Sequence, residues 1–284
     1  MKKRNIAFSV ATICAVSAFL LSGCNGGKQI DNNPVEYVKV DEEVHLQDDS
    51  KSPSCKLTIN YAYLAENSTT DTIAHRINET VQSVALGKEY VQMMPTIAVD
   101  SFKNAYISNY RKEVAELYEE DIKNGTPKEE LPSWYNYEYS LTTTFADGKE
   151  GITTCTVGKF EYSGGAHPNS WEQWLNFDKK TGKLLPLSEV FMSGSETPMS
   201  NLLMNELLKV MAEKFPDEKI ESLEGLQNAG ILLDTKIYVP ENFLLEPDKV
   251  SFLYNKYDIA PYAVGEIILS LPYTAVEKYM IQAK

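Results

Sequence analysis

Strict alternation of aromatic and polar side chains over residues 135–145 constrains the fold of this chain more than any other feature. One set of alternate positions is apolar or aromatic with a single threonine, and the other is polar: Tyr135, Tyr137, Tyr139, Leu141, Thr143 and Phe145 alternate with Asn136, Glu138, Ser140, Thr142 and Thr144. A period of two is incompatible with a helix and predicts a strand with one face against a core. Asp147 and Gly148 then supply a tight turn, so residues 152–162 should return as an antiparallel strand.

The remaining elements fall into groups of strands and groups of helices. Period-two patterns predict strands near 56–63, 171–177, 250–254 and 266–271, and helical patterns begin near Asp71, Thr96 and Thr197. The apolar face of 152–162 changes phase near Gly158, which predicts a β-bulge. Because strands and helices do not alternate strictly, we expect an α+β fold, with mainly antiparallel sheets, packed helices and two intimately associated subdomains.

The first 24 residues carry the pattern of a lipoprotein signal peptide. Lys2, Lys3 and Arg4 precede an apolar run that is too short and too weakly flanked for a lasting membrane span, and Leu21-Ser22-Gly23-Cys24 follows it. This pattern predicts cleavage before Cys24 and a lipid on its sulfur. An ordinary signal peptide that ends by chance in cysteine is the alternative.

The predicted lipid sets the expected location. We expect a membrane-anchored lipoprotein of the cell envelope. The segment after Cys24 lacks an acidic block, which favours the periplasmic face of the outer membrane; the choice between inner membrane, outer membrane and cell surface stays open.

Four segments are predicted along the chain. They are the signal peptide at 1–23, a polar and acidic tether at 24–53, an N-terminal α+β subdomain at 54–163 and a C-terminal α+β domain at 164–284. Within the tether, residues 35–46 alternate well enough that they could dock as an edge strand.

The charge of the chain limits its partners. The net charge is −13, and removal of residues 1–23 leaves 24 basic against 40 acidic residues, a net charge of −16. Nucleic acids and anionic lipid surfaces would be repelled, so no nucleic-acid partner is expected, whereas cationic proteins would be attracted. Solubility at the end of a lipid tether is the simpler explanation of the same charge.

Two cysteines remain after the N-terminal pair is assigned. Cys14 leaves with the signal peptide and Cys24 carries the lipid, so Cys55 and Cys155 are left. In an oxidising compartment such a pair predicts a disulfide that closes a long loop. Two buried free thiols are the alternative.

His167 is the one histidine in an unusual setting. The loop Ser163-Gly164-Gly165-Ala166-His167-Pro168-Asn169 has two glycines and a proline, so it is a shaped loop rather than a helical turn. Either His167 is a general base or ligand-binding group beside Glu161 and Asp178, or its ring bonds to backbone and holds the loop in shape.

Other catalytic and cofactor patterns are missing from the sequence. The histidines and cysteines lack the spacing of zinc ligands, and no nucleophile elbow or phosphate-binding loop occurs, so we predict no metal and no cofactor. The 17 tyrosines and three tryptophans could form a stacking platform for sugar rings, or they could fill the core.

Two blocks of the C-terminal half resemble a bacterial envelope-domain family of unknown function. The first runs from Gly164-Gly165-Ala166-His167-Pro168-Asn169 to Leu187-Ser188-Glu189-Val190-Phe191, and the second is Tyr257-Asp258-Ile259-Ala260-Pro261-Tyr262-Ala263-Val264-Gly265. The domain is similar to the extracellular half of the lysozyme-sensing anti-sigma factor and to the accessory domain beside peptidoglycan deacetylases. The likeness covers about 164–280, and residues 55–160 more loosely resemble the small α+β domain that usually precedes it.

The resemblance implies an α+β fold and an envelope role in binding or sensing. It supplies candidate ligand-binding loops at Gly164, Gly165, His167, Pro168 and Asn169, and at Tyr257, Pro261 and Tyr262. The transmembrane helix of the anti-sigma factor and the metal-binding motifs of the deacetylase catalytic domain are not found in this sequence.

We therefore expect a non-enzymatic lipoprotein that binds or senses an envelope ligand, either a protein such as a cationic muramidase or a peptidoglycan component. The rival is an enzyme that acts on cell-wall glycan or peptide through His167 and carboxylates. A structural envelope component without a ligand is the third hypothesis, and the oligomeric state stays open.

Overall fold

The computed structural model describes residues 29–30, 33–47, 49–66, 71–127, 131, 133–233 and 235–281. The predicted signal peptide, Cys14 and the lipidation site at Cys24 lie outside these residues. No helix in the described ranges is long and apolar enough to span a membrane.

Six strands form the larger sheet, in the order in which they occur along the chain. They are β1 (Gln29–Ile30), β2 (Asn33–His45), β3 (Ser54–Leu64), β4 (Tyr137–Asp147), β5 (Ile152–Tyr162) and β6 (Asn169–Asp178). All neighbours are antiparallel except β3 and β4. The predicted hairpin of residues 135–162 is confirmed as β4 and β5.

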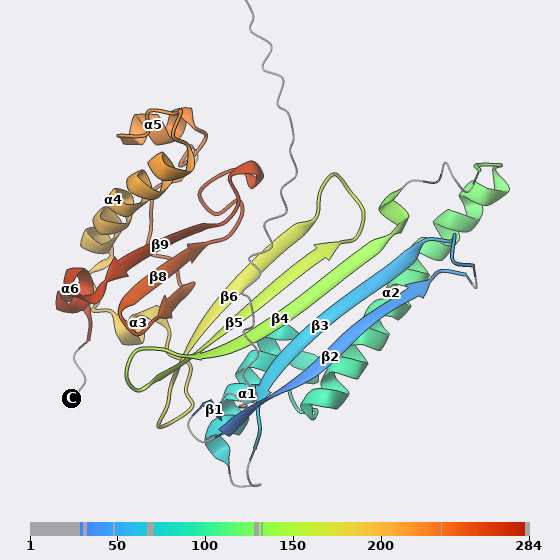
Figure 1. The fold of residues 1–284 in the computed structure, drawn as a ribbon, viewed down its shortest axis with the longest axis horizontal. Helices are drawn as coiled ribbons and strands as arrows, with labels where there is room; N and C mark the ends of the chain where they lie inside the picture. The colour runs from blue at the N-terminus through green and yellow to red at the C-terminus, as the bar shows by residue number, and fades with distance from the viewer. Residues whose placement is uncertain are drawn as a thin grey trace, which may run out of the picture.

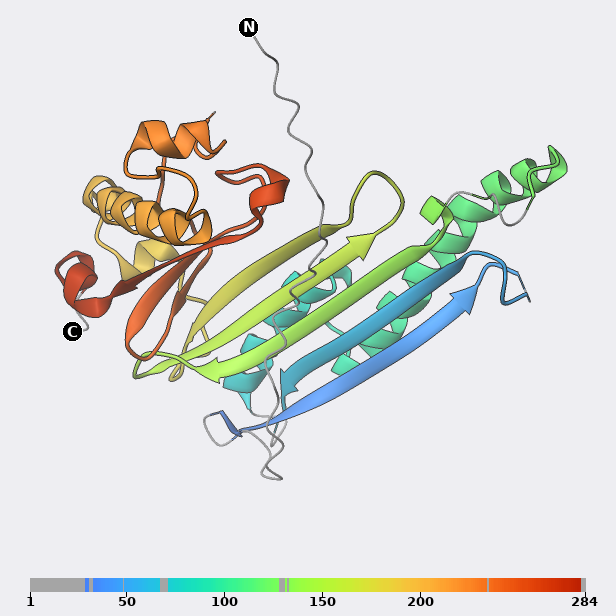
Figure 2. The same cartoon turned by 45° about the horizontal axis from the view of Figure 1, so that its top comes forward.

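Two helices cover one face of this sheet. The chain leaves β3 through α1 (Thr72–Ala85), the short η1 (Lys88–Tyr90), α2 (Pro95–Lys123) and η3 (Ser133–Tyr135), and re-enters as β4 parallel to β3. Figures 1 and 2 show α1 and α2 on the same face of the strands. Such a crossover is required between parallel neighbours, because a tight turn reverses the chain direction.

The alternating tyrosines of β4 pack against α2. The ring of Tyr139 lies 5.3 Å from that of Phe102 and 4.9 Å from that of Tyr106, and the rings of Tyr137 and Tyr110 are 5.1 Å apart. The aromatic face that predicted the strand is therefore the core-facing side of the sheet.

The folded part begins earlier than the predicted tether allows. The edge strand that the alternation at residues 35–46 allowed is present: β2 pairs with β3 at every position from Val35 to His45, so this part of the predicted tether belongs to the sheet. At the other end, β6 pairs with β5 from Asn169 to Asp178 and belongs to the first sheet. We place the division between the two units after Asp178 rather than at residue 164.

The predicted β-bulge at Gly158 is wrong. Gly158 lies opposite Thr142 on β4 and Glu172 on β6, and the register runs unbroken on both sides. The phase changes because the next residues on the helical face, Lys159 and Glu161, are polar. Lys159 donates to the Val84 carbonyl near the end of α1 (2.9 Å), so polar side chains replace apolar ones on this face of β5 while the strand continues.

A second unit packs helices on a three-stranded sheet. It comprises α3 (Leu187–Val190), α4 (Glu196–Lys214), α5 (Leu223–Asn228), β7 (Phe243–Leu245), β8 (Lys249–Tyr254), η4 (Tyr262–Val264), β9 (Ile267–Pro272), α6 (Tyr273–Val276) and η5 (Glu277–Tyr279). The buried stripe of α4, Leu203, Leu207 and Met211, recurs every four residues and shares one core with Phe252 and Leu269 of the sheet. The expected α+β fold is confirmed.

Asparagine side chains join the two units. Asn176 on β6 donates to the Phe243 carbonyl (2.9 Å) and accepts from the Leu245 N–H (2.8 Å) of β7. Asn242 and Asn255, from the second unit, do the same on the outer edge of β6. Their side-chain oxygens accept from the N–H groups of Trp174 and Glu172, and both side-chain nitrogens donate to the Glu172 carbonyl. The side-chain amides take the place of a neighbouring strand, because they bond to backbone N–H and C=O groups of β6 and β7 that would otherwise lack partners.

The predicted disulfide is also wrong. Cys55 and Cys155 are both buried free thiols. Cys55 lies opposite Tyr137 and Cys155 opposite Phe145, eight residues further along β4. At a rise of about 3.3 Å per residue the two thiols are roughly 26 Å apart along the sheet, far beyond disulfide reach.

Candidate functional site

The two candidate ligand-binding loops meet at the junction between the units. His167 comes from the loop between β5 and β6, and Tyr257 and Tyr262 come from the loop between β8 and β9. The ring of His167 stacks on that of Tyr262 with centroids 4.0 Å apart and planes inclined by 24°. The Tyr257 hydroxyl lies 3.1 Å from His167 Nε2, although the two residues are 90 positions apart. We call His167, Tyr257 and Tyr262 the aromatic junction.

Backbone conformations that side chains rarely adopt shape both loops. Gly164 and Gly165 have φ values of +87° and +99°, and a Cβ on Gly164 would come within 3.3 Å of the Trp134 carbonyl oxygen. Tyr257 has a φ of 72° and leaves 60% of its surface exposed. Strain of this kind at an exposed aromatic residue is typical of functional positions.

The other predicted loop residues act as supports. The Pro168 carbonyl lies 3.0 Å from His167 Nδ1, and Pro261 directly precedes the η4 turn that presents Tyr262. Asn169 begins β6, and its side chain turns to the helical face, away from the junction. Asn169 instead lines a pocket with Tyr139 and Lys159.

A lysine and a glutamate lie next to the aromatic junction and are linked through a serine. The Lys256 ammonium lies 4.6 Å from the centre of the Tyr262 ring and donates to the Ser170 hydroxyl. Ser170 in turn donates to the Glu266 carboxylate (3.0 Å). Lys256 and His167 thus both contact the Tyr262 ring, whereas Tyr257 leaves 60% of its surface exposed.

The structure does not bring together the residues that the enzymatic hypothesis needs. Both ring nitrogens of His167 already face partners, the Pro168 carbonyl and the Tyr257 hydroxyl. Glu161 lies on the helical face, where it accepts from the Tyr106 hydroxyl (2.8 Å). Asp178 is at the far end of β6, roughly 30 Å from Asn169 at the usual strand rise.

A small pocket lies beside these loops, on the face of the larger sheet that α1 and α2 cover. It has a volume of about 270 Å³ and is lined by Tyr139, Lys159, Glu161, Asn169 and Trp171. The Lys159 ammonium lies 5.5 Å from the centre of the Trp171 ring. Burial lowers the pKa of Lys159, and the Glu161 carboxylate opposes that shift. The phase change near Gly158 is the sequence signal for this pocket, because it marks where polar side chains enter the helical face of β5.

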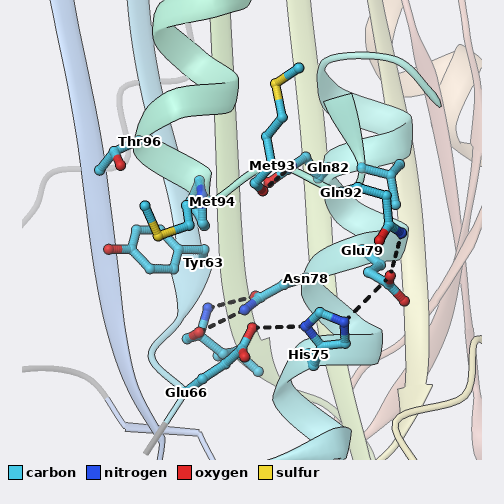
Figure 3. Close-up of a pocket in the computed structure, with 13 residues that line it drawn as sticks. Tyr63, Glu66, His75, Asn78, Glu79, Gln82, Gln92, Met93, Met94 and Thr96 are labelled. Carbon is cyan, nitrogen blue, oxygen red and sulfur yellow. Dashed lines mark hydrogen bonds and ion pairs between the residues drawn. The ribbon is translucent and has the colours of Figure 1, made fainter. Parts of the chain in front are cut away.

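A larger pocket opens between β3, α1 and the start of α2 (Figure 3). Its volume is about 390 Å³. His75 Nδ1 lies 3.2 Å from Glu66 and Nε2 lies 3.4 Å from Glu79, and Met93 and Met94 add thioether surface. Two carboxylates on a half-exposed histidine favour donors or cations in this pocket. The one sequence signal for this pocket is the spacing of His75 and Glu79, which stand one helical turn apart.

In the ranges that the structure describes, no group of three or more His, Cys, Asp or Glu side chains is arranged to hold a metal ion.

Two family models match the chain. Residues 188–274 match the family described as a protein of unknown function, DUF3298, and residues 49–170 match the family described as deacetylase PdaC. The first match covers α3 to the start of α6, and the second runs from the end of β2 to the start of β6. No curated protein matches the chain.

Solved structures of related proteins share the architecture. A member of the DUF3298 family from Bacteroides fragilis is 29% identical, with a TM-score of 0.78 over 88% of this chain and 94% of the other. A DUF3298 family protein from Pseudomonas aeruginosa is 15% identical over the same shares of both chains, with a TM-score of 0.57, and shows likeness of fold alone. The chain is thus similar to the PdaC family over residues 49–170 and to the DUF3298 family over residues 188–274, the pair that the sequence resemblance indicated.

Proposed function

We propose that this chain is a non-enzymatic lipoprotein of the cell envelope that binds an envelope ligand through the aromatic junction. One observation carries the proposal: two loops that are far apart in sequence converge to present three aromatic rings at an exposed surface. Tyr257 is held there in a strained conformation and packs into no core, which favours a role in binding.

The favoured ligand is a cationic protein, of which a muramidase is the example. Exposed tyrosines are common energetic centres of protein interfaces, because the ring gives contact area and the hydroxyl a hydrogen bond. The net charge of −16 that remains after removal of residues 1–23 would speed the encounter with a cationic partner and make it sensitive to salt. A peptidoglycan component, recognised by stacking on the same rings, is the other ligand class.

Binding is measured by titration calorimetry with a cationic lysozyme at low and physiological salt, and by co-sedimentation with purified peptidoglycan. Tyr257→Ala should weaken binding at least tenfold, because the ring is exposed and its loss should leave the core intact. Tyr37→Ala is the matched control, since Tyr37 is 49% exposed on the opposite edge of the sheet.

Two outcomes would contradict this model. Unchanged affinity of Tyr257→Ala would remove the aromatic junction as the binding surface, and an absence of binding to both probes would remove the binding function. Turnover of peptidoglycan fragments that His167→Ala abolishes would support the enzymatic rival instead.

The proposed anchor is a lipid on Cys24, which would hold the protein at the periplasmic face of the outer membrane. Mass spectrometry of the native protein should find an acylated N-terminus at Cys24, and Cys24→Ala should move the protein to the soluble fraction. A soluble wild-type protein without acyl groups would refute the anchor without touching the binding model.

A further inference from the structure

The outer edge of β2 has no strand beside it over most of its length. β1 pairs only with Asn33 and Pro34, and no other strand in the described part of the chain pairs with the outer side of residues 35–45. Figure 1 shows β2 at the border of the larger sheet. The free segment is long, has no proline and keeps an unbroken register with β3, so it lacks several of the usual devices that protect an edge.

The direction of the backbone groups on this edge follows from its two ends. The Pro34 carbonyl accepts from the Ala65 N–H (2.8 Å), and the Leu46 N–H donates to the Pro53 carbonyl (2.8 Å). Even-numbered residues of β2 thus bond toward β3. The odd-numbered residues from Val35 to His45 point their N–H and C=O groups outward.

We propose that a second copy of this chain pairs with this edge, antiparallel, about a two-fold axis at Val40. Val40 is the midpoint of the free segment, so a pair centred there uses residues 35–45 of both copies completely. If the register shifted by one position, odd-numbered residues of one copy would face even-numbered residues of the other. The backbone N–H and C=O groups of those even-numbered residues are already bonded to β3. Residues directly opposite each other in an antiparallel pair project to the same side of the sheet. The pairing at Val40 therefore places the helices of both copies on the same face of the combined sheet.

Charge selects the same register. With the axis at Val40, Lys39 of each copy faces Asp41 of the other. An axis at residue 39 would set Lys39 against Lys39, and an axis at residue 41 would set Asp41 against Asp41. Like charges directly opposite each other destabilise a sheet, whereas opposite charges stabilise it.

The remaining acidic residues of β2 are engaged within their own chain. Glu36 accepts from the Tyr63 hydroxyl, Glu42 pairs with Lys103 and Glu43 accepts from the Ser54 hydroxyl. Asp41 has no such partner among the described side chains. It is therefore the acid on this strand that the lysine of a second copy would satisfy.

A cysteine at the axis tests the register directly. Val40 would face its own copy in a non-hydrogen-bonded pair, where Cα atoms lie about 4.5 Å apart, within disulfide reach. The full chain with Val40→Cys, oxidised in its native envelope, should form a covalent dimer. Val38→Cys is the matched control on the same face of β2, because residue 38 lies opposite Tyr61 within its own chain and faces residue 42 of the second copy. The wild-type chain should not cross-link, since Cys55 and Cys155 are buried.

Charge exchange gives a second test that does not depend on new thiols. Lys39→Asp and Asp41→Lys change exposed side chains, and each should weaken dimerisation at least tenfold in sedimentation experiments. An equal mixture of the two variants should dimerise again, because each then faces its complement.

The proposal is overturned if Val40→Cys does not cross-link, if Val38→Cys cross-links as readily, or if the mixed variants stay monomeric. A wild-type chain that stays monomeric while a cationic extended peptide protects the β2 amides from exchange would assign this edge to a different partner. This surface lies at the opposite edge of the sheet from β6 and the aromatic junction, so its failure would leave the proposed binding function intact.

Discussion

Replacing Asn176 with alanine should lower the free energy of unfolding by roughly 2–6 kcal/mol. The side chain is 1% exposed, and its amide serves the Phe243 carbonyl at 2.9 Å and the Leu245 N–H at 2.8 Å. Alanine leaves both backbone groups buried without a partner, at about 1–3 kcal/mol each. The loss is large beside the 5–15 kcal/mol by which a domain is typically stable.

Urea denaturation followed by tryptophan fluorescence and circular dichroism measures this loss. Asn60→Ala is the control. Like Asn176, Asn60 lies on the face of the larger sheet that points away from α1 and α2, but its buried Oδ1 has no hydrogen-bond partner in the described structure. We expect the control to change stability by less than about 1 kcal/mol. A similar small effect for Asn176→Ala would refute the reasoning, because it would mean that water replaces the bonds at no cost.

Two further predictions concern titratable groups. Burial raises the pKa of Glu172, and neighbouring Glu266 adds to the shift. The folded protein thus keeps the Glu172 proton to a higher pH than the unfolded chain does. Protonation of Glu172 therefore stabilises the fold fully below the ordinary glutamate pKa, and this stabilisation is lost as the pH rises through the pKa of Glu172 in the folded protein. Glu172→Gln should therefore match the wild type in thermal melts near pH 4 and melt higher near pH 8; equal melting temperatures at both values would contradict this. Burial raises the pKa of Cys55 to about 12 and also raises that of Cys155, so both should resist a thiol reagent in the folded protein and react in denaturant, whereas rapid labelling at pH 8 would show that the core opens.

Local patterns in the sequence were sufficient for the main elements. The alternation at 135–145 predicted β4, the turn at Asp147 and Gly148 predicted the return of β5, and the four-residue stripe predicted α4. Each of these signals depends on backbone periodicity within one element. The error at Gly158 had another cause: α1 ends beside Lys159, and polar side chains that bond to the two helices take over this face of β5, which the sequence of a single strand does not reveal.

The candidate site was only partly predictable. The glycines and proline around His167, together with the family resemblance, indicated both loops that form the aromatic junction. The contact between His167 and Tyr257 joins two units, and no local pattern encodes it. The disulfide prediction failed for the same reason, because it required the register of two strands that are separated by a third.

The sequence by itself determined the element types, the α+β class and the loops with unusual backbone shapes, because these depend on neighbours along the chain. Only the tertiary structure decided which residues meet. It separated Cys55 from Cys155, placed Asn169 in a pocket on the helical face rather than beside His167, and left the edge of β2 open. Such outcomes depend on strand order and register, which arise from the packing of the whole fold.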